Sequence, residues 1–404
     1  GQYHWRLEEG ANLWSTLQTK FKTYPDILEG NGYYVGYTGK GWGPGLEEMG
    51  GRKRNPAGNT FNDVKSDTPE HINGINYTEN FKKFLAEKPG NEPFCFWYGG
   101  FEPHRGYKKG LGKESGKNPA NIDVPSSFPD NPEVRNDIID YYTEIEWFDH
   151  HLGEMIALLE ERGELENTIV ICTSDNGMPF PRSKSNLYDL GTRMPLAIKW
   201  RGKVGGNRVV EDFVSLTDLA PTILEAAGIK IPVEVTGSSL IDILFSGKSG
   251  KVEPGRDHVL TGKERHAWVR KGGKGYPMRA IRNEDYLFII NFEPERWPAG
   301  DDKGFEFLSP NQIYGDDDGS PTKTYLLNSL NDPVNRNLYN LAYGKRPGEE
   351  LYDLRKDPDQ LNNQAYNEDY LQVKNDLKKQ LLDELLSYED PRMIGDGQIF
   401  DRYP

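Results

Sequence analysis

The chain has 404 residues, with 49 Lys and Arg against 63 Asp and Glu, and a formal net charge of −14. This acidic balance argues against a nucleic acid as partner, because binding the phosphate backbone needs basic surfaces, whereas a locally positive pocket for an anionic substrate is compatible with it. Hydrophobic residues make up 35% of the chain and no apolar run is long enough to cross a bilayer, so the sequence predicts no membrane span.

The first half of the chain alternates predicted helices and strands, which is the pattern of a parallel sheet covered by helices on both faces. Strands are predicted at residues 33–38, 93–100, 168–173, 194–200 and 213–216, and helices at 24–29, 78–88, 133–162, 218–227 and 240–245. The run TIVICT at 168–173 has no polar alternation, which favours a strand buried on both faces of a parallel sheet. Cys95 and Cys172 lie in such apolar runs, so we expect buried free thiols, although the spacing leaves a disulfide open.

The second half has a different pattern, with short strands separated by turns. These strands are predicted at residues 258–261, 267–270, 276–282, 286–291 and 350–354, followed by an amphipathic helix at 369–388. The order predicts an antiparallel meander. We therefore expect an α/β domain at residues 1–254 and a smaller C-terminal α+β subdomain at 255–404. Three polar stretches, 45–77, 106–132 and 292–343, carry no assignable pattern.

Chemically active residue types follow three of the predicted strands. Lys40 lies in a glycine-rich loop after residues 33–38, His104 follows 93–100, and Asp175 and Asn176 follow 168–173, with Lys184 in the next loop. Ligand sites of open α/β sheets lie at the carboxyl ends of their strands, so these side chains are candidates for one site. The oxygens of Asp175 and Asn176 suit Ca²⁺ or Mg²⁺, the lysines suit an anion, and a histidine titrates near neutral pH. The alternative is ordinary: an Asx-Gly turn that closes a strand, beside solvated loop residues.

Five segments in this order resemble the type I sulfatases of the alkaline-phosphatase superfamily. They are GYTGKGW, FEPHRGY, TIVICTSDNG with the following lysine and NLYDLGTRMPLAIKW, VSLTDLAPTILEAAGI, and ELYDLRKDPDQLNN. The stretch YPMRAIRNEDYLFIINFEPERWPAGD further resembles the branch that contains heparan N-sulfatase and bacterial or marine polysaccharide sulfatases. The resemblance covers essentially the whole chain. It implies an α/β fold of the alkaline-phosphatase-like class, with a mostly parallel sheet between helices and a smaller C-terminal antiparallel-sheet subdomain.

The resemblance also implies a reaction and a set of roles. In this family a formylglycine hydrate, made from Cys or Ser in a C/S-x-P-S-R motif, attacks the sulfur of a sulfate ester with the help of one Ca²⁺ ion. The matching residues here are Asp175 and Asn176 as Ca²⁺ ligands, Lys40 and Lys184 on the sulfate and the nucleophile, His104 at the leaving group, and Arg265 and His266 facing the substrate. The implied partner is a sulfated oligosaccharide or polysaccharide, and the implied location is periplasmic or extracellular.

Two features depart from the family pattern. No C/S-x-P-S-R motif occurs in the sequence, and neither cysteine lies in one. The Asp-Asp pair that the family supplies to Ca²⁺ from its first strand is also missing, and Gly1-Gln2 resembles the residues that follow the nucleophile motif. The resemblance therefore leads us to expect the nucleophile segment upstream of residue 1. In addition, Trp42 stands where the family usually has a histidine.

Two other functions remain as alternatives. A related phosphatase, phosphodiesterase or phosphonate hydrolase would use transition metals with histidine ligands, and the few histidines near strand ends weigh against a two-zinc site. A non-catalytic saccharide-binding homologue would need no nucleophile.

Overall fold

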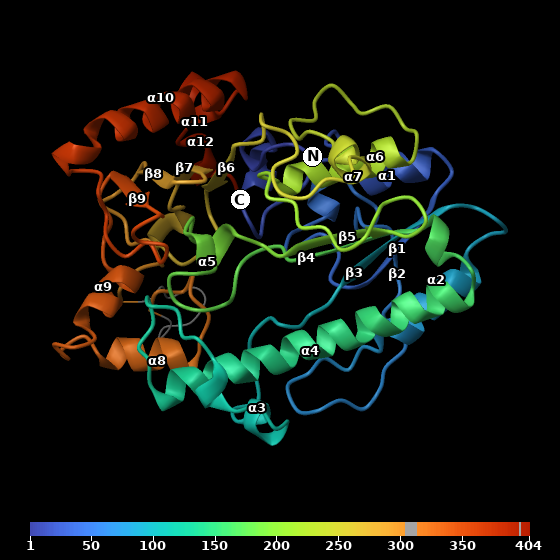
Figure 1. Ribbon diagram of the computed structural model, residues 1–404, viewed down its shortest axis with the longest axis horizontal. Helices are drawn as coiled ribbons and strands as arrows, with labels where there is room; N and C mark the ends of the chain where they lie inside the picture. The colour runs from blue at the N-terminus through green and yellow to red at the C-terminus, as the bar shows by residue number, and fades with distance from the viewer. Residues whose placement is uncertain (304–312, 396) are drawn as a thin grey trace.

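The computed structural model describes residues 1–303, 313–395 and 397–404, and Figure 1 shows how the elements are arranged. The strands are β1 Tyr34–Gly39, β2 Asn59–Thr60, β3 Phe94–Gly99, β4 Ile169–Thr173, β5 Leu196–Trp200, β6 His258–Lys263, β7 Met278–Asn283, β8 Tyr286–Asn291 and β9 Glu349–Asp353. The helices are α1 Tyr24–Gly30, α2 Tyr77–Glu87, α3 Leu111–Glu114, α4 Pro132–Glu161, α5 Asp189–Thr192, α6 Leu219–Ala226, α7 Ile241–Phe245, α8 Pro321–Asn328, α9 Arg336–Tyr343, α10 Leu371–Ser387, α11 Pro391–Ile394 and α12 Ile399–Arg402. No helix in these ranges is long and apolar enough to cross a membrane.

Two small sheets lie between helical layers in the first half of the chain (Figure 1). One has the order β2-β1-β3 with parallel pairs, and the other pairs β4 with β5. Successive side chains of a strand point to opposite faces, and the cores follow this rule. Phe94 and Phe96 of β3 pack with α2 and α4 on one face, whereas Cys95 packs with α1 and α6 on the other. The predicted arrangement of strands covered by helices on both faces is confirmed.

The expected environment of the strand at 168–173 differs in the structure. Strand β4 pairs with β5 in the antiparallel direction, and all five of its residues are half-buried rather than buried. In β3, the side chain of Trp97 is exposed, at 43%. Within the residues described, the second edges of β3 and β4 have no strand partner. An apolar run predicts that both faces of a strand can be buried, but it does not predict whether a neighbouring strand is present or in which direction that strand runs.

Two predicted strands are wrong. Residues 213–216 and 267–270 form no strand, because their hydrogen bonds go elsewhere. The Ser215 hydroxyl accepts a hydrogen bond from the Thr217 amide and begins a helical turn, and the Arg270 carbonyl accepts from the Gly273 amide over 2.9 Å in a turn. Both runs are only four residues long, so a local cap or turn outweighs their strand propensity.

The second half contains the expected antiparallel meander. Strands β6, β7, β8 and β9 pair in chain order, all antiparallel. Helix α10 covers one face through Leu377, Leu381 and Leu385, and Tyr188 packs on the other face. Trp5, near the N-terminus, belongs to the α10 core as well. Segments on both sides of residue 254 therefore share these cores, and the division at 254/255 stays a prediction.

The cysteines are free, as expected, although both residues are half-buried rather than buried. Burial of the Cys95 thiol raises its pKa to about 12. The long unassigned stretch at 292–343 contains α8 and α9 within its described part.

Candidate functional site

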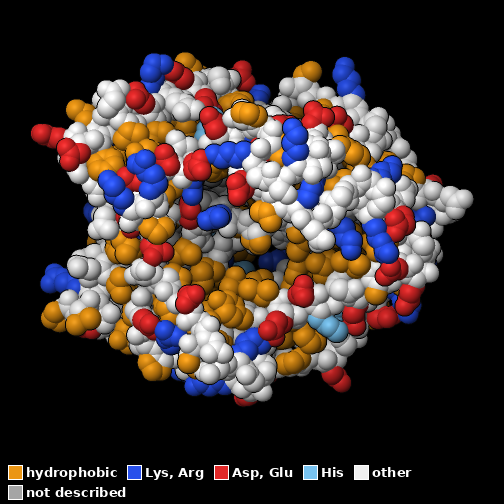
Figure 2. All heavy atoms as spheres, in the orientation of Figure 1, with side chains coloured by type: hydrophobic (Ala, Val, Ile, Leu, Met, Phe, Trp, Pro, Cys, Tyr) orange, Lys and Arg blue, Asp and Glu red, His pale blue; other side chains and the backbone are white. Residues whose placement is uncertain are grey.

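The candidate residues lie at the strand ends from which they were predicted. Lys40 follows β1, and His104 lies in the loop after β3. These two strands are parallel, so both residues lie at the carboxyl ends of the strands, on the same side of the sheet. Nε2 of His104 lies 3.5 Å from Nζ of Lys184. Figure 2 shows the molecule hollowed near the centre of this face, with hydrophobic side chains around the hollow and a basic side chain visible within it. The structure thus brings His104 and Lys184 into contact.

The imidazole of His104 is oriented by its own loop. Nδ1 lies 2.6 Å from the carbonyl oxygen of Arg105. A carbonyl only accepts, so Nδ1 carries the hydrogen, and Nε2 is left to accept a hydrogen bond from the Lys184 ammonium. Burial is the largest effect on the pKa of His104 and lowers it, and the charges of Lys184 and Lys40 lower it further, whereas the Arg105 carbonyl and Asp318 raise it. Burial and the two lysines therefore favour the neutral imidazole, whereas Asp318 and the Arg105 carbonyl favour the protonated one.

Lys40 is held close to the second strand. Its backbone amide donates to the carbonyl of Gly99 over 2.6 Å. A Cβ on Gly99 would lie 1.8 Å from the Lys40 carbonyl oxygen, so only glycine permits this approach. Burial lowers the pKa of Lys40, the charge of Asp175 opposes that shift more than any other group, and Lys184 adds to it. Lys40, Lys184 and Asp175 therefore share one electrostatic environment.

Asp175 and Asn176 form the turn after β4. The Asp175 residue is exposed, and the Ser174 hydroxyl donates to the backbone carbonyl of Asn176 over 2.8 Å. Gly177 is required behind them, because a Cβ there would lie 1.8 Å from the carbonyl oxygen of Leu190. Carboxylate and amide oxygens suit Ca²⁺, which takes six to eight oxygen ligands. No group of three or more His, Cys, Asp or Glu suited to a metal occurs in the described ranges, so this pair fits Ca²⁺ in chemistry but supplies only part of its ligands.

The two residues expected to face the substrate have different surroundings. Arg265 is buried, stacks on Trp268 at 4.4 Å, and donates hydrogen bonds to the carbonyls of Gly273, Tyr403 and Pro404. Its guanidinium therefore holds the C-terminal residues, and the structure does not bring it to Lys184. The Nδ1 atom of His266 lies 3.2 Å from a carboxylate oxygen of Asp316.

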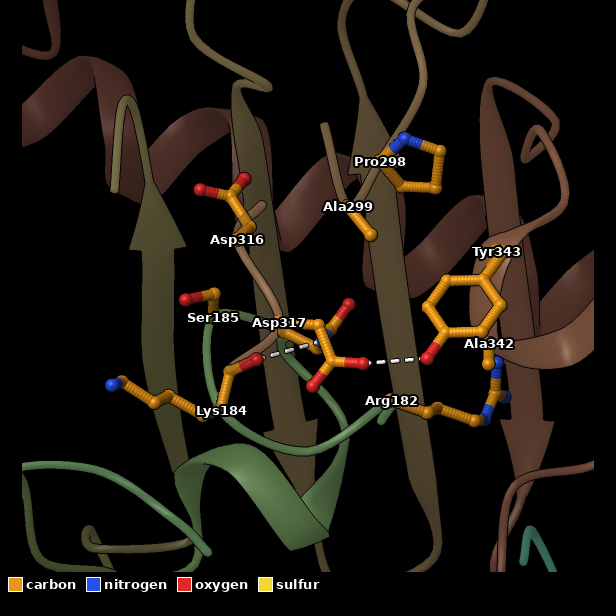
Figure 3. A pocket seen from close by; sticks show the side chains of 10 residues that line it. Arg182, Lys184, Ser185, Pro298, Ala299, Asp316, Asp317, Ala342 and Tyr343 are labelled. Carbon is orange, nitrogen blue, oxygen red and sulfur yellow. Dashed lines mark hydrogen bonds between the residues drawn. The ribbon is translucent and has the colours of Figure 1, made fainter. Parts of the chain in front are cut away.

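A run of three aspartates at 316–318 was missed from the sequence and reaches this site. Asp318 Oδ2 lies 2.8 Å from Nζ of Lys184. Asp316 accepts from Arg270 over 2.7 Å, and Asp317 accepts from the Tyr343 hydroxyl over 2.6 Å. Figure 3 shows Asp317 directed towards Tyr343, while the Lys184 side chain points away from the pocket that these residues line. Three adjacent carboxylates repel one another unless each has a positively charged or hydrogen-bonding partner. The run of three aspartates was therefore the sequence signal that could have indicated a role in the site.

One ion pair connects the loops that carry these side chains. Arg105, next to His104, donates two hydrogen bonds to Asp137 of α4 and a third, from Nε, to the carbonyl of Pro179. The Asp137 carboxylate also accepts from the amide and the hydroxyl of Thr322, at the start of α8. The loops of His104, Lys184 and Asp318 are therefore tied to a single buried pair.

Comparison with known proteins agrees with this geometry. Residues 2–229 match the Sulfatase family, and residues 182–298 match the family described as N-sulphoglucosamine sulphohydrolase, C-terminal. The N-sulphoglucosamine sulphohydrolase of Homo sapiens is 30% identical over 281 residues, which cover 65% of this chain and 50% of that protein. An ulvan-active sulfatase of Formosa agariphila is 26% identical over 282 residues, 70% of this chain and 43% of that protein. The chain thus spans about half the length of these curated relatives.

A solved structure shares the fold. It is described as being in complex with its substrate, D-glucosamine-2-N,6-O-disulfate, and aligns with a TM-score of 0.62 and 18% identity over 93% of this chain and 84% of that one. The expected α/β, alkaline-phosphatase-like fold with a C-terminal antiparallel sheet is confirmed. Since the Sulfatase family matches more than half of its residues, the chain belongs to the sulfatase family.

Proposed function

We propose that this protein hydrolyses sulfate groups of a sulfated saccharide, using a formylglycine nucleophile that lies outside residues 1–404. The contact between His104 and Lys184, at 3.5 Å, carries the proposal, because it joins an ammonium group to a histidine at the ends of the strands. Lys40 and Asp175 share the same electrostatic environment. Such a group suits a tetrahedral oxyanion whose charge shifts during transfer.

The roles follow from the charges. Lys40 and Lys184 bind the sulfate oxygens and stabilise negative charge as it develops. His104 lies beside Lys184 and, once it is protonated at Nε2, can deliver a proton to the departing oxygen or nitrogen. Asp175 and Asn176 contribute oxygen ligands to one Ca²⁺, which when bound would polarise the sulfate. His266 faces the saccharide beside the acidic run, whereas the hydrogen bonds of Arg265 give no support to a substrate contact.

The substrate class rests on the relatives. One is named for sulphoglucosamine and another for ulvan, both of them sulfated saccharides. We propose a sulfated oligosaccharide or polysaccharide as the partner and a periplasmic or extracellular location, as for enzymes that degrade such polymers.

The test is sulfate release by the protein expressed from its full reading frame and matured with formylglycine. Glucosamine N,6-disulfate and ulvan oligosaccharides serve as substrates, with Ca²⁺ present. Lys184→Ala and His104→Ala are expected to lower kcat about 100-fold or more, the usual effect of losing a transition-state contact. Lys379→Ala and His150→Ala are matched controls, because their side chains are 78% and 61% exposed.

Three outcomes separate the alternatives. No sulfate release from any glycan by the wild type would overturn the proposal and favour a saccharide-binding homologue. Faster release of phosphate, with zinc rather than calcium in the purified protein, would favour a phosphatase or phosphonate hydrolase. Wild-type rates in both site variants would remove those two residues from the mechanism.

A further inference from the structure

The acidic run next to Lys184 contains one carboxylate whose position is not explained by packing. Asp316 is buried, and Arg270, Lys263 and His266 surround it. Asp317 is occupied by the Tyr343 hydroxyl. Asp318 is different, because its side chain is 24% exposed and its single described ion pair is with Lys184, which is itself 11% exposed.

The three side chains form a chain of contacts. The Asp318 carboxylate accepts from the Lys184 ammonium over 2.8 Å, and the same ammonium lies 3.5 Å from Nε2 of His104. On the other side of the imidazole, the Nδ1 atom of His104 donates to the carbonyl of Arg105. An ammonium donates three hydrogens, so Lys184 can serve both neighbours and still direct one hydrogen at a bound sulfate.

The backbone around Asp318 is fixed independently of Lys184. The Lys323 ammonium donates to the carbonyls of Tyr314 and Asp317, which closes the loop around a buried cation. Ser320 caps α8 through the Lys323 amide, and Thr322 binds Asp137. Asp318 is thus presented to Lys184 by a preformed loop, as a positioning group must be.

The charges give the carboxylate a function. The groups that act on His104 are Lys184 and Lys40, both positive, and Asp318, the negative one, together with the Arg105 carbonyl. A protonated His104 beside two ammonium groups is disfavoured by like charge unless a carboxylate offsets them. Burial opposes ionisation of Asp318, but Lys184 outweighs it and lowers the pKa of the carboxyl below its usual value, so Asp318 carries its charge.

We propose that Asp318 is a positioning residue of the sulfatase reaction, which fixes Lys184 and offsets its positive charge, so that the neighbouring imidazole of His104 can take up the proton that it delivers to the leaving group. The inference rests on the function proposed above. In that step the bond from sulfur to the bridging oxygen or nitrogen breaks, and its electron pair stays on the departing atom. That atom takes the proton from Nε2 of His104, which becomes neutral, while sulfur gains its bond to the nucleophile oxygen, which attacks in its deprotonated form after its own proton has passed to solvent.

The first experiment needs no turnover. In histidine-labelled protein, the pKa of His104 is followed by NMR, with His104→Gln identifying its resonance. Asp318→Asn is expected to lower that pKa and Asp318→Glu to leave it near the wild-type value. Asp383→Asn is the control, because Asp383 also pairs with a lysine but is 62% exposed on α10. An unchanged His104 pKa in Asp318→Asn would overturn the inference.

The second experiment uses sulfate release by the full-length protein. Asp318→Asn should lower kcat about 10- to 100-fold, with a smaller change in KM, and move the alkaline limb of the kcat profile, where His104 loses the proton that it must deliver, to lower pH. Asp318→Glu should recover part of kcat. Loss of kcat together with a lower unfolding temperature and an unmoved pH profile would show a merely structural role and overturn the inference. Absence of sulfate release by the wild type would instead overturn the proposed function, while the NMR titration would still decide the coupling.

Discussion

Arg105 and Asp137 form a bidentate ion pair in the interior, with N–O distances of 2.5 and 3.0 Å and side chains that are 6% and 1% exposed. The guanidinium lies between the rings of Tyr107 and Phe180, at 4.5 and 4.4 Å. A lysine keeps the charge but provides neither the planar fork nor the stacking. Arg105→Lys should therefore lower the free energy of unfolding by about 2 kcal/mol, measured by urea denaturation. It should also lower kcat, because His104 is the neighbouring residue.

The matched control for that change is Arg135→Lys. Arg135 makes a similar two-bonded pair with Asp130, but the two side chains are 26% and 58% exposed. Exposed pairs contribute little, so a loss below about 1 kcal/mol is expected. Equal losses in both variants would mean that burial of the Arg105 pair does not matter.

Calcium should be needed for activity, and calcium binding should depend on Asp175 and Asn176 in the turn after β4. Asp175→Ala and Asn176→Ala each remove an oxygen donor, so the purified full-length protein should retain less calcium by elemental analysis and lose most of its sulfate release. A chelator should reduce wild-type activity, and added Ca²⁺ should restore it. Asp376→Ala, at an exposed position of α10, should keep wild-type calcium content. Full calcium retention in both turn variants would refute the metal assignment.

Glu144 on α4 should make stability fall as the pH rises. Burial raises its pKa to about 8 from the usual 4.5, and Glu102 and Asp140 add to the effect. Between these two values the unfolded chain has lost the proton that the folded chain still holds, so the folded state is disfavoured increasingly up to pH 8. Glu144→Gln cannot ionise, and it should gain on the order of 2 kcal/mol over wild type at pH 8 and little at pH 4.5. Urea titrations at both pH values provide the measurement, and an equal effect at both would contradict it.

His258 should have the opposite dependence. Its hydrogen bond to Glu384 is the main reason that its pKa is raised to about 9 from 6.5, and Asp257 contributes as well. The stabilisation is fully present below pH 6.5 and is lost as the pH rises towards 9. His258→Gln should therefore lower the unfolding temperature at pH 6 and have a smaller effect at pH 9.5. His150→Gln, 61% exposed, is the control.

The sequence located part of this site because strand ends are visible in it. Lys40, His104 and Asp175 were predicted from apolar runs that stop at polar turns, and His104 does meet Lys184. Asp318 was missed, since it lies in a stretch without periodicity and reaches Lys184 across 134 positions of sequence. The family resemblance implied that Arg265 faces the substrate, but the direction of its guanidinium depends on the carbonyl of Tyr403, far away in the sequence, which no local pattern reports.

The second edges of β3 and β4, which lack a strand partner in the described part of the chain, affect how this polypeptide should behave in solution. Each edge presents a row of backbone groups to which another extended segment can pair, and the adjoining side chains are apolar and half-buried. A polypeptide made only of residues 1–404 is therefore expected to self-associate at high concentration. Light scattering would show this, and a lysine placed on β4 should reduce it, as charged edge residues do in natural sheets.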